Sequence, residues 1–358
     1  MTTDITALKI NLHKDLSALC EGGEKDLGAR IAALYHPEVE VRAAHPMNEG
    51  AGLDFLADSL WRPLMTALPD LERRDLIVMG GTYEGRTYVA MMGHYCGTFR
   101  QDWLTIPATG RPIYLRSGEV HEIRDGKIVQ TNCLWDVLDV IRQAGFWPLA
   151  PSLGTEGMWP GPISGDGLVF TPQDPGQGAA SIAQTLAMHG TLAAYDDFGE
   201  HGREGLLTMP QKEHWHPRMM WYGPSGIGTT RGLQGFVDYH QLPFRRAFPG
   251  RKGGGQWDEI AELKAQHKGG HYIRVGDGPY SVTGGWPSVF ATHDGPDFLG
   301  LAATGRPVMM RVMDFYLHHQ GLIRENWVPL DILDLLMQMG VDVMDRMQSH
   351  FRRGAGLE

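Results

Sequence analysis

The sequence contains a long internal repeat. Residues 107–128 read PATGRPIYLRSGEVHEIRDGKI, and residues 302–323 read AATGRPVMMRVMDFYLHHQGLI. The match continues without gaps from residues 77–147 onto residues 272–342. Two gapless copies of this length are typical of a duplicated domain. The chain is therefore expected to fold twice into the same architecture.

An earlier pair of segments matches in a different register. Residues 36–70 align on residues 216–250, and both copies open with His-Pro. The change of register predicts an insertion in the second copy, around RKGGGQWDEIAELKA. The 358 residues suffice for two domains of ordinary size, each with its own core. The expected organisation is a first domain at 1–149, a Gly/Pro-rich linker at 150–178, a second domain at 179–350 and a tail at 351–358.

Each copy shows the same order of predicted elements. Helices come first, then a short strand after His-Pro, another helix, and three or four strands rich in Val, Ile, Tyr and Met. Asp125-Gly126 between two strand-like runs predicts a hairpin. Amphipathic helices over 137–144 and 332–339, ended by Gly145 and Gly340, close the copies. Helices leading into a strand meander predict an α+β class.

Charge and composition narrow the range of partners. The net charge of −10 and the isoelectric point near 5.9 argue against nucleic acid or an anionic membrane surface as the main partner. No apolar run approaches a membrane span or a signal peptide. The three cysteines form neither a disulfide framework nor a metal-spaced cluster. A cytoplasmic location is therefore expected.

The motifs resemble those of a known family. The series GHYCGTF, PATGRPIYL, EIRDGKIVQTN and the closing QAG is similar to the SnoaL-like polyketide cyclases, and AATGRPVMM, GLIRENW and QMG repeat the pattern. These cyclases belong to the cystatin-like α+β superfamily, which also contains ketosteroid isomerase and nuclear transport factor two. The motifs occur in the same order in both copies, and the two copies together cover most of the chain outside the linker and the insertion.

The resemblance implies two cone-shaped domains, in which N-terminal helices pack on a curved antiparallel sheet around a pocket. It also implies acid–base catalysis by an Asp, often helped by a His, with no metal or organic cofactor. The ligand would be a hydrophobic small molecule. The copies would pair within the chain as a pseudo-two-fold dimer, and further homo-oligomers are left open. Fold alone does not fix function.

Asp136 and Asp331 align at the start of the closing helices, where the family has its catalytic Asp. A carboxylate in an apolar pocket has a raised pKa, which suits proton transfer at carbon. The alternative is that each side chain caps its helix. Both interpretations stay open, and helix capping is the favoured role for either residue taken alone.

Histidines and aromatic residues supply the other candidates. His121 could assist Asp136, whereas the second copy has Tyr316 there and His318 two residues later on the same face. His94 lies where the family often has a His, and its gapless counterpart is Val289. A surface or rim position is the commoner role for such strand histidines.

The second copy is richer in aromatic residues, among them Trp286 and Trp327, which could help to line a wide pocket for a planar ligand. An ordinary aromatic core explains them equally well. This asymmetry suggests that the second copy is the closer match to an active enzyme.

Two arginines, Arg116 and Arg311, hold the same strand position in both copies, and Glu119 and Asp314 share the opposite face. An arginine could orient an enolate or carboxylate in the pocket, but a structural ion pair is the favoured interpretation. EHWHP at 213–217 and HKGGH at 267–271 suggest metal chelation only weakly, because no third ligand accompanies them.

Three functions remain open: an acid–base enzyme, a non-catalytic carrier or sensor of small molecules, and a scaffold in which one half covers the other. No GxSxG, Walker or GxGxxG pattern supports serine, nucleotide or dinucleotide chemistry.

Overall fold

The computed structural model describes residues 4–194, 198–249, 266, 270–296 and 298–354. The chain divides into two compact units. The first comprises residues 1–148, 160–172 and 342–358, and the second comprises 149–159 and 173–341. The inserted segment of the second copy lies outside the described residues.

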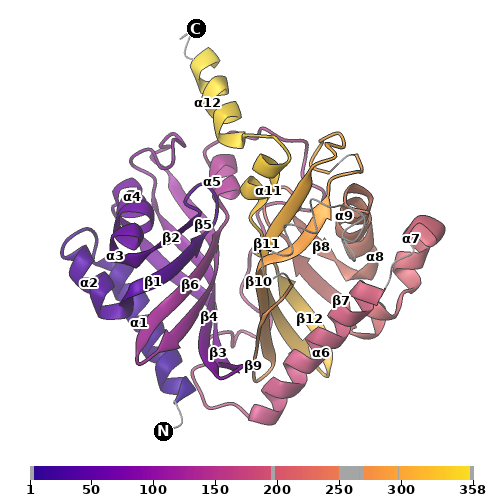
Figure 1. The fold of residues 1–358 in the computed structure, drawn as a ribbon, viewed down its shortest axis with the longest axis horizontal. Coiled ribbons are helices and arrows are strands. Elements are labelled where there is room, and N and C mark those ends of the chain that lie inside the picture. Colours follow the sequence, from indigo (N-terminus) through magenta and orange to yellow (C-terminus); the bar gives the residue numbers. More distant parts are fainter. Residues whose placement is uncertain (1–3, 195–197, 250–265, 267–269, 297, 355–358) are drawn as a thin grey trace. The chain divides into compact units, whose positions relative to one another are not determined.

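The first unit is built on a six-stranded sheet with the order β2–β1–β6–β5–β4–β3 (Figure 1). β1 and β6 run parallel, and the other neighbouring strands run antiparallel. The strands are β1 (Tyr35–Ala43), β2 (Glu49–Ala51), β3 (Glu72–Tyr83), β4 (Arg86–Thr98), β5 (Pro112–Arg124) and β6 (Lys127–Trp135).

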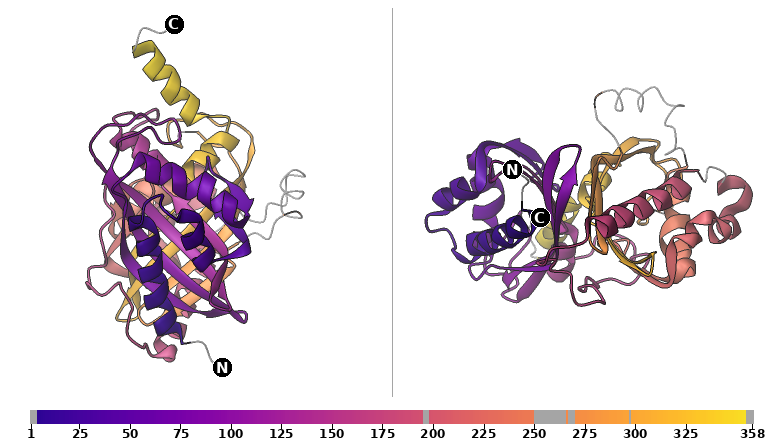
Figure 2. Two further views of the ribbon diagram at one scale, coloured as in Figure 1. Left: turned by 90° about the vertical axis from the view of Figure 1, so that its left-hand side faces the viewer. Right: turned by 90° about the horizontal axis from the view of Figure 1, so that it is seen from below.

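Helices cover one face of this sheet (Figures 1 and 2). Leu16, Ile31 and Leu64, one from each of three helices, are fully buried there. Asp4 begins the first helix by accepting a hydrogen bond from the Ala7 amide at 3.0 Å. The helices of the first unit are α1 (Ile5–Glu21), α2 (Leu27–Leu34), α3 (Gly52–Phe55), the π-helix η1 (Leu56–Trp61), α4 (Arg62–Ala67), α5 (Val137–Gln143) and α12 (Val343–Gly354), and the last two lie at the end of the sheet, off this face.

The second unit repeats the arrangement, with the strand order β8–β7–β12–β11–β10–β9. Again only the β7–β12 pair is parallel. The strands are β7 (Trp215–Tyr222), β8 (Thr229–Arg231), β9 (Ile273–Asp277), β10 (Tyr280–Thr292), β11 (Pro307–His319) and β12 (Leu322–Trp327). The identical order confirms the expected α+β class for both copies. The pseudo-two-fold relation between them stays a prediction.

The helices of the second unit also follow those of the first in order. They are α6 (Pro175–Ala194), α7 (Phe198–Thr208), the 3-10 helix η2 (Pro210–Glu213), α8 (Gly232–Phe236), the π-helix η3 (Val237–Gln241), α9 (Leu242–Ala247) and α11 (Ile332–Gln338). Each copy has a π-helix between two short α-helices. Single π-turns of this kind often mark functional sites.

The hairpin turns follow the sequence. Asp125 and Gly126 have φ values of 50° and 75°, and Gln320 and Gly321 have 52° and 75°. Positive φ at both central residues is the requirement of a type I′ turn, which matches the twist of the flanking strands. The expected hairpin therefore forms in both copies.

One part of the gapless alignment is wrong. Tyr95 on β4 lies opposite Leu115, whereas Val289 on β10 lies opposite Met310. Because Leu115 and Met310 are equivalent, Val289 occupies the position of Tyr95, one residue earlier than the sequence match gives. Earlier on β10, Gly285 lies opposite Val312 and so occupies the position of Gly93, three residues earlier than the sequence match gives. The β10–β11 pairing is irregular between Gly285 and Val289, which reduces the difference from three residues to one.

The Gly/Pro-rich segment between the copies is an ordered loop shared between the units. Its later part belongs to the first unit, where Leu168 bridges Val78 in parallel and the Val78 amide donates to the Gly167 carbonyl at 2.9 Å. The final helix α12 also belongs to the first unit, and the His350 ring lies 4.8 Å from that of Phe146. This division differs from the expected boundary, which placed residues up to 350 with the second domain.

Within the described part of the chain, no helix is long and apolar enough to cross a membrane.

Candidate functional site

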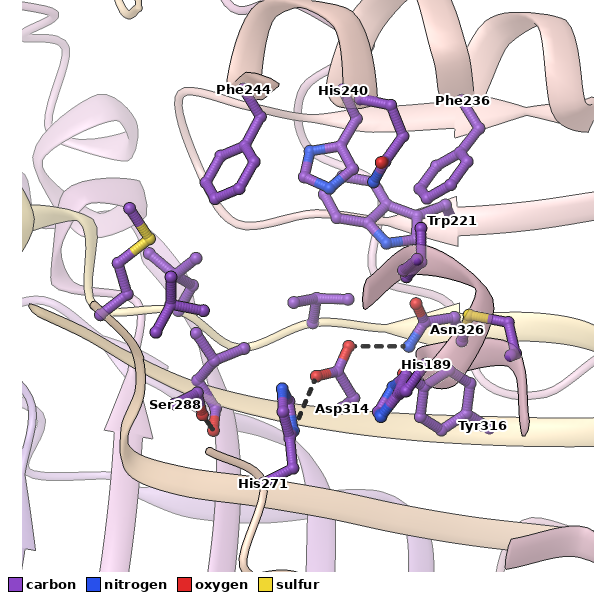
Figure 3. Close-up of a pocket in the computed structure, with 18 of the residues that line it drawn as sticks. His189, Trp221, Phe236, His240, Phe244, His271, Ser288, Asp314, Tyr316 and Asn326 are labelled. Carbon is purple, nitrogen blue, oxygen red and sulfur yellow. Dashed lines mark hydrogen bonds and ion pairs between the residues drawn. The ribbon is translucent and has the colours of Figure 1, made fainter. Parts of the chain in front are cut away.

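A cavity of about 630 Å³ lies inside the second unit. This volume is within the range usual for small-molecule sites. Its walls come from α6, the segment before β9, the strands β7, β10, β11 and β12, and the α8–η3–α9 region. Figure 3 shows an aromatic side facing a band of polar side chains.

The aromatic side consists of Trp221 on β7, Phe236 on α8, His240 on η3 and Phe244 on α9. The rings of His240 and Trp221 stack, with centroids 4.0 Å apart and planes at 19°. The His240 ring also lies 5.2 Å from Phe236 and 5.8 Å from Phe244. These flat faces suit a planar, largely apolar ligand.

Asp314 is the carboxyl group of the polar band. It projects from β11, and the residue is only 8% exposed. Nδ1 of His271 lies 3.7 Å from one carboxyl oxygen, and the Asn326 amide donates to the other at 3.4 Å. Burial raises the pKa of Asp314 to about 7, and hydrogen bonds with Asn326 and Tyr316 oppose that rise only partly.

Two further histidines belong to this band. His189 on α6 is hydrogen-bonded through Nε2 to the Tyr316 hydroxyl at 2.8 Å, and its ring lies 4.8 Å from that of His271. Burial lowers the pKa of His189 to about 4 and that of His271 to about 3, and Arg274 acts in the same direction on both. Both imidazoles are therefore neutral at pH 7.

The equivalent position of the first unit is occupied very differently. Glu119 on β5 accepts hydrogen bonds from Arg73 at 2.7 Å, Tyr95 at 2.6 Å and the Trp135 indole at 2.9 Å. Burial alone would raise its pKa, but Arg73, His121 and Tyr95 outweigh burial and hold the pKa well below the usual range. Glu119 is thus held as a charged, fully hydrogen-bonded group.

His121 belongs to the same buried network. Its Nδ1 lies 2.8 Å from the Thr131 hydroxyl, and its Nε2 lies 3.4 Å from Glu119. Only 1% of the residue is exposed. The partners of His121 are therefore Thr131 and Glu119, and the structure does not bring it together with Asp136 as the sequence suggested.

Asp136 and Asp331 both cap the closing helices. The Asp136 carboxylate accepts from the Asp139 amide at 3.0 Å, and that of Asp331 accepts from the Asp334 amide at 3.1 Å. Neither residue is among those that line the cavity. The structure therefore places both in the capping position, with Asp314 as the carboxyl group in the cavity.

Arg116 and Arg311, which hold the same strand position in the two copies, form ion pairs with these capping residues. Arg116 lies 3.3 Å from Asp136 and 2.9 Å from Asp139. Arg311 lies 3.1 Å from Asp331 and packs over the ring of Trp286, 4.9 Å from its centroid. Arg311 and Trp286 do not line the cavity, and the ion pairs agree with the structural role that the sequence favoured.

Of the other expected pocket residues, Tyr316 does line the cavity. His318 lies outside it and hydrogen-bonds Ser281 at 3.0 Å and Thr185 at 3.1 Å. Trp327 is fully buried and stacks on Tyr222 at 5.2 Å. These two residues serve the packing of the second unit.

His94 faces the Tyr114 ring at 5.5 Å. Burial and the nearby Arg116 lower the pKa of His94 to about 4. His94 lies opposite Arg116, and the equivalent Arg311 falls at the irregular stretch of β10, residues 286–288, which contains no histidine. A histidine role at this position is therefore confined to the first copy.

The helix histidine of the polar band, His189, was not a candidate from the sequence. The sequence signal that could have found it is spacing, because Ser181, Thr185 and His189 recur every four residues and so share one face of α6. The structure buries Ser181 and Thr185 on that face. The metal interpretation gains no support, since no group of three His, Cys, Asp or Glu side chains could hold an ion in the part of the chain that is described. His267 of HKGGH lies outside that part.

Comparison with known proteins relates the first copy to a protein family. Residues 23–144 match the family model described as SnoaL-like polyketide cyclase. The first copy carries a SnoaL-like domain. The second copy has the same strand order as this SnoaL-like domain, including the parallel pair that joins its first long strand to its last. No curated protein matches the chain.

Solved structures similar to the chain match about one repeat each. TsrD from Streptomyces laurentii is 20% identical, with 40% of this chain and 98% of that chain covered and a TM-score of 0.32. A nuclear transport factor 2 (NTF2-like) superfamily protein from Salmonella enterica is 13% identical, with 36% and 89% covered and a TM-score of 0.28. An NTF2-like protein of unknown function from Burkholderia pseudomallei is 14% identical, with 39% and 97% covered and a TM-score of 0.30.

Proposed function

We propose that the second unit is a cofactor-independent acid–base enzyme of the SnoaL-like polyketide cyclase type. Its substrate would be a hydrophobic carbonyl compound, and its reaction an aldol cyclisation or a related isomerisation. One observation carries the proposal. The carboxyl group of Asp314 is buried, faces an aromatic-lined cavity, and has a pKa raised to about 7.

A carboxyl group with this pKa suits proton transfer at neutral pH. Both its charged and neutral forms are populated, so it can accept a proton and later return it. The carboxylate would take a proton from the carbon next to the substrate carbonyl, and the electron pair would move onto the carbonyl oxygen. The protonated Asp314 would then deliver the proton to oxygen or to another carbon.

The neighbouring groups support this role of Asp314. His271 beside it is neutral, so it can accept or donate a hydrogen bond without fixing the charge on the carboxyl group. The aromatic side chains opposite would hold the substrate body and exclude water. We assign no proton transfer to Asp331, Asp136 or His121, because none of the three lines the cavity.

Proton exchange tests the proposal directly. The full chain is incubated in D₂O with hydrophobic ketones such as 2-tetralone, and deuterium uptake at the carbon next to the carbonyl is followed by NMR. Asp314→Asn should abolish the protein-catalysed uptake. Asp331→Asn is the matched control, since Asn also caps helices, and it should retain uptake.

A carrier is the second candidate, favoured by the stacked aromatic faces of Trp221 and His240. Quenching of tryptophan fluorescence reports binding, because Trp215 and Trp221 both line the cavity. Binding without uptake across a ketone panel, unchanged by Asp314→Asn, would support the carrier and sink the enzyme proposal.

A further inference from the structure

A side-chain amide belongs to the aromatic side of the cavity. Gln241 is the last residue of η3, lines the cavity and is only 6% exposed. Figure 3 shows its chain neighbour His240 on this side, across the cavity from the polar band that contains Asp314. Gln241 therefore brings a hydrogen-bonding group to a wall that is built mainly from rings.

Arg245 on α9 determines which way this amide points. Its Nε group donates a hydrogen bond to the Gln241 side-chain oxygen at 3.2 Å, and its Nη2 group donates to the Leu192 carbonyl at 3.3 Å. Arginine has donors but no acceptor, so the oxygen end of the amide must face it. The amide nitrogen of Gln241, with its two N–H donors, is therefore turned away from Arg245.

This amide nitrogen has no hydrogen-bond partner among the residues that the structure describes. It is not sealed in the packed interior, as the indole nitrogen of Trp215 is, and it is therefore open to the cavity that Gln241 lines. A ligand that fills the cavity keeps water from this donor. Such a ligand must bring an acceptor of its own, because a buried donor without a partner is costly.

The first unit shows where a side chain at this position points. The counterpart of Gln241 is Trp61, the last residue of η1, and each is followed by one residue and then a proline. The Trp61 ring lies 5.8 Å from that of Tyr95 and 5.9 Å from that of Trp135. Both of these rings are hydrogen-bonded to Glu119, at the carboxyl position shared by the two units. By this equivalence Gln241 points into the space in front of the carboxyl group of the second unit.

We propose that Gln241 is a specificity-determining residue, whose amide N–H donates a hydrogen bond to a carbonyl oxygen of the ligand. The cavity then selects planar, apolar carbonyl compounds over hydrocarbons of the same shape, because only the former satisfy this donor. The inference deepens the proposed function and rests on this cavity as its substrate site. Arg245 is the positioning residue, since it holds the amide by its oxygen end.

The test compares 2-tetralone with tetralin, which has the same fused rings but no carbonyl group. Equilibrium dialysis against the full chain gives the affinity for each compound, and the ratio of the two affinities isolates the contribution of the carbonyl oxygen. Gln241→Met keeps the length of the side chain but removes the donor, so the ketone-to-hydrocarbon ratio should fall about three- to tenfold. Gln241→Glu keeps an acceptor for Arg245 and presents oxygen in place of the N–H donors, so the ratio should fall at least as far.

Ser288→Ala is the matched control. Ser288 also lines the cavity, but its hydroxyl is already hydrogen-bonded to the Gly285 carbonyl at 3.1 Å and the Val312 carbonyl at 3.2 Å. Its removal should therefore leave the ratio of the two affinities unchanged.

An unchanged or increased ratio in either Gln241 variant overturns the inference, and so does an equal fall in Ser288→Ala. If Gln241→Met fails to fold, as judged by near-ultraviolet circular dichroism, Gln241→Glu decides alone. No binding of 2-tetralone to the unaltered protein overturns the inference too. The proposed enzyme activity can fail separately: if the ratio falls in the Gln241 variants and no proton exchange occurs, the donor role stands without the acid–base chemistry.

Discussion

Glu119 and Asp314 stand at equivalent positions on β5 and β11, and their surroundings push their protonation in opposite directions. Glu119 is bonded to the fixed cation Arg73, to Tyr95 and to Trp135, which keep it charged. Asp314 has a neutral imidazole 3.7 Å away and a raised pKa. One fold therefore supports both a structural carboxylate and a titratable one.

The residues that differ also decide where there is space. Val289 takes the place of Tyr95, and Leu330 takes the place of Trp135, since Leu330 bridges Val312 as Trp135 pairs with Ser117. Both smaller residues line the cavity of the second unit. At these two positions the first unit therefore has a hydrogen-bond donor to Glu119, and the second unit has a smaller apolar residue that lines the cavity.

The largest effect is expected from removal of the Arg73 cation of the first unit. Arg73→Met leaves the buried carboxylates of Glu119 and Asp75 without their arginine cation, and the free energy of unfolding of that unit should fall by about 3–5 kcal/mol. Hydrogen exchange of the β3–β5 amides measures the change. Arg74→Met is the control, because the exposed Arg74–Glu72 pair should contribute about 1 kcal/mol or less. Equal losses in the two variants would contradict the network.

Asp314→Asn should show how much stability the second unit loses because the pKa of Asp314 is raised. The pKa rises from 3.8 to about 7 on folding, so the native protein loses stability as pH rises between these values. The variant avoids this loss. It should be as stable as the native protein below pH 4 and more stable above pH 7, by roughly 4 kcal/mol at most.

Thermal melting from pH 4 to pH 8 measures this difference. Glu119→Gln supplies the opposite case, because the lowered pKa of Glu119 makes its charged form stabilising at neutral pH. Its destabilising effect should shrink as pH falls below the ordinary glutamate range. Parallel pH trends in the two variants would show that the carboxyl groups are not in contrasting environments.

Filling the cavity of the second unit tests whether this space holds the ligand. Leu330→Trp restores the bulk that the first unit has, and ligand affinity should fall about tenfold or more, a loss of about 1.4 kcal/mol. Quenching of the native tryptophans by 2-tetralone gives the affinity. Leu322→Trp, at the start of β12 and away from the cavity lining, should bind as the native protein does. Unchanged affinity in Leu330→Trp would place the ligand elsewhere.

The smallest effects are expected at the helix caps. Asp331→Ala removes a cap and an ion-pair partner of Arg311, so stability should fall by about 1–2 kcal/mol. Asp331→Asn should cost only a few tenths of a kcal/mol, since Asn caps well. Chemical denaturation of both variants measures the difference. A large loss of proton-exchange activity in Asp331→Asn, with stability intact, would return Asp331 to the catalytic role.

Much of the fold follows from local sequence. The repeated strand pattern, the Asp125-Gly126 turn and the capped closing helices depend on neighbouring residues, and the structure shows all of them. The alternation along β11 also placed Asp314 on the face opposite Arg311 from the sequence alone. These features are set within a few residues of chain.

The site depended on contacts that sequence spacing does not contain. His189 and His271 approach Asp314 and Tyr316 from distant parts of the chain, and their positions follow from how α6 and the segment before β9 pack on the sheet. The strand pairing at Val289 differs by one residue from the gapless sequence match, which hid the exchange of Tyr95 for Val289. Local patterns cannot supply such tertiary facts.

The division of the chain bears on how this duplicated protein can evolve. The polypeptide passes from one unit to the other four times, at residues 148, 159, 172 and 341. Neither copy can therefore be cut out of the gene as one uninterrupted stretch, since α12, encoded beyond the second repeat, completes the surface around Phe146 of the first. A recombination event that swaps or deletes one repeat would therefore also separate the other repeat from segments that belong to its unit.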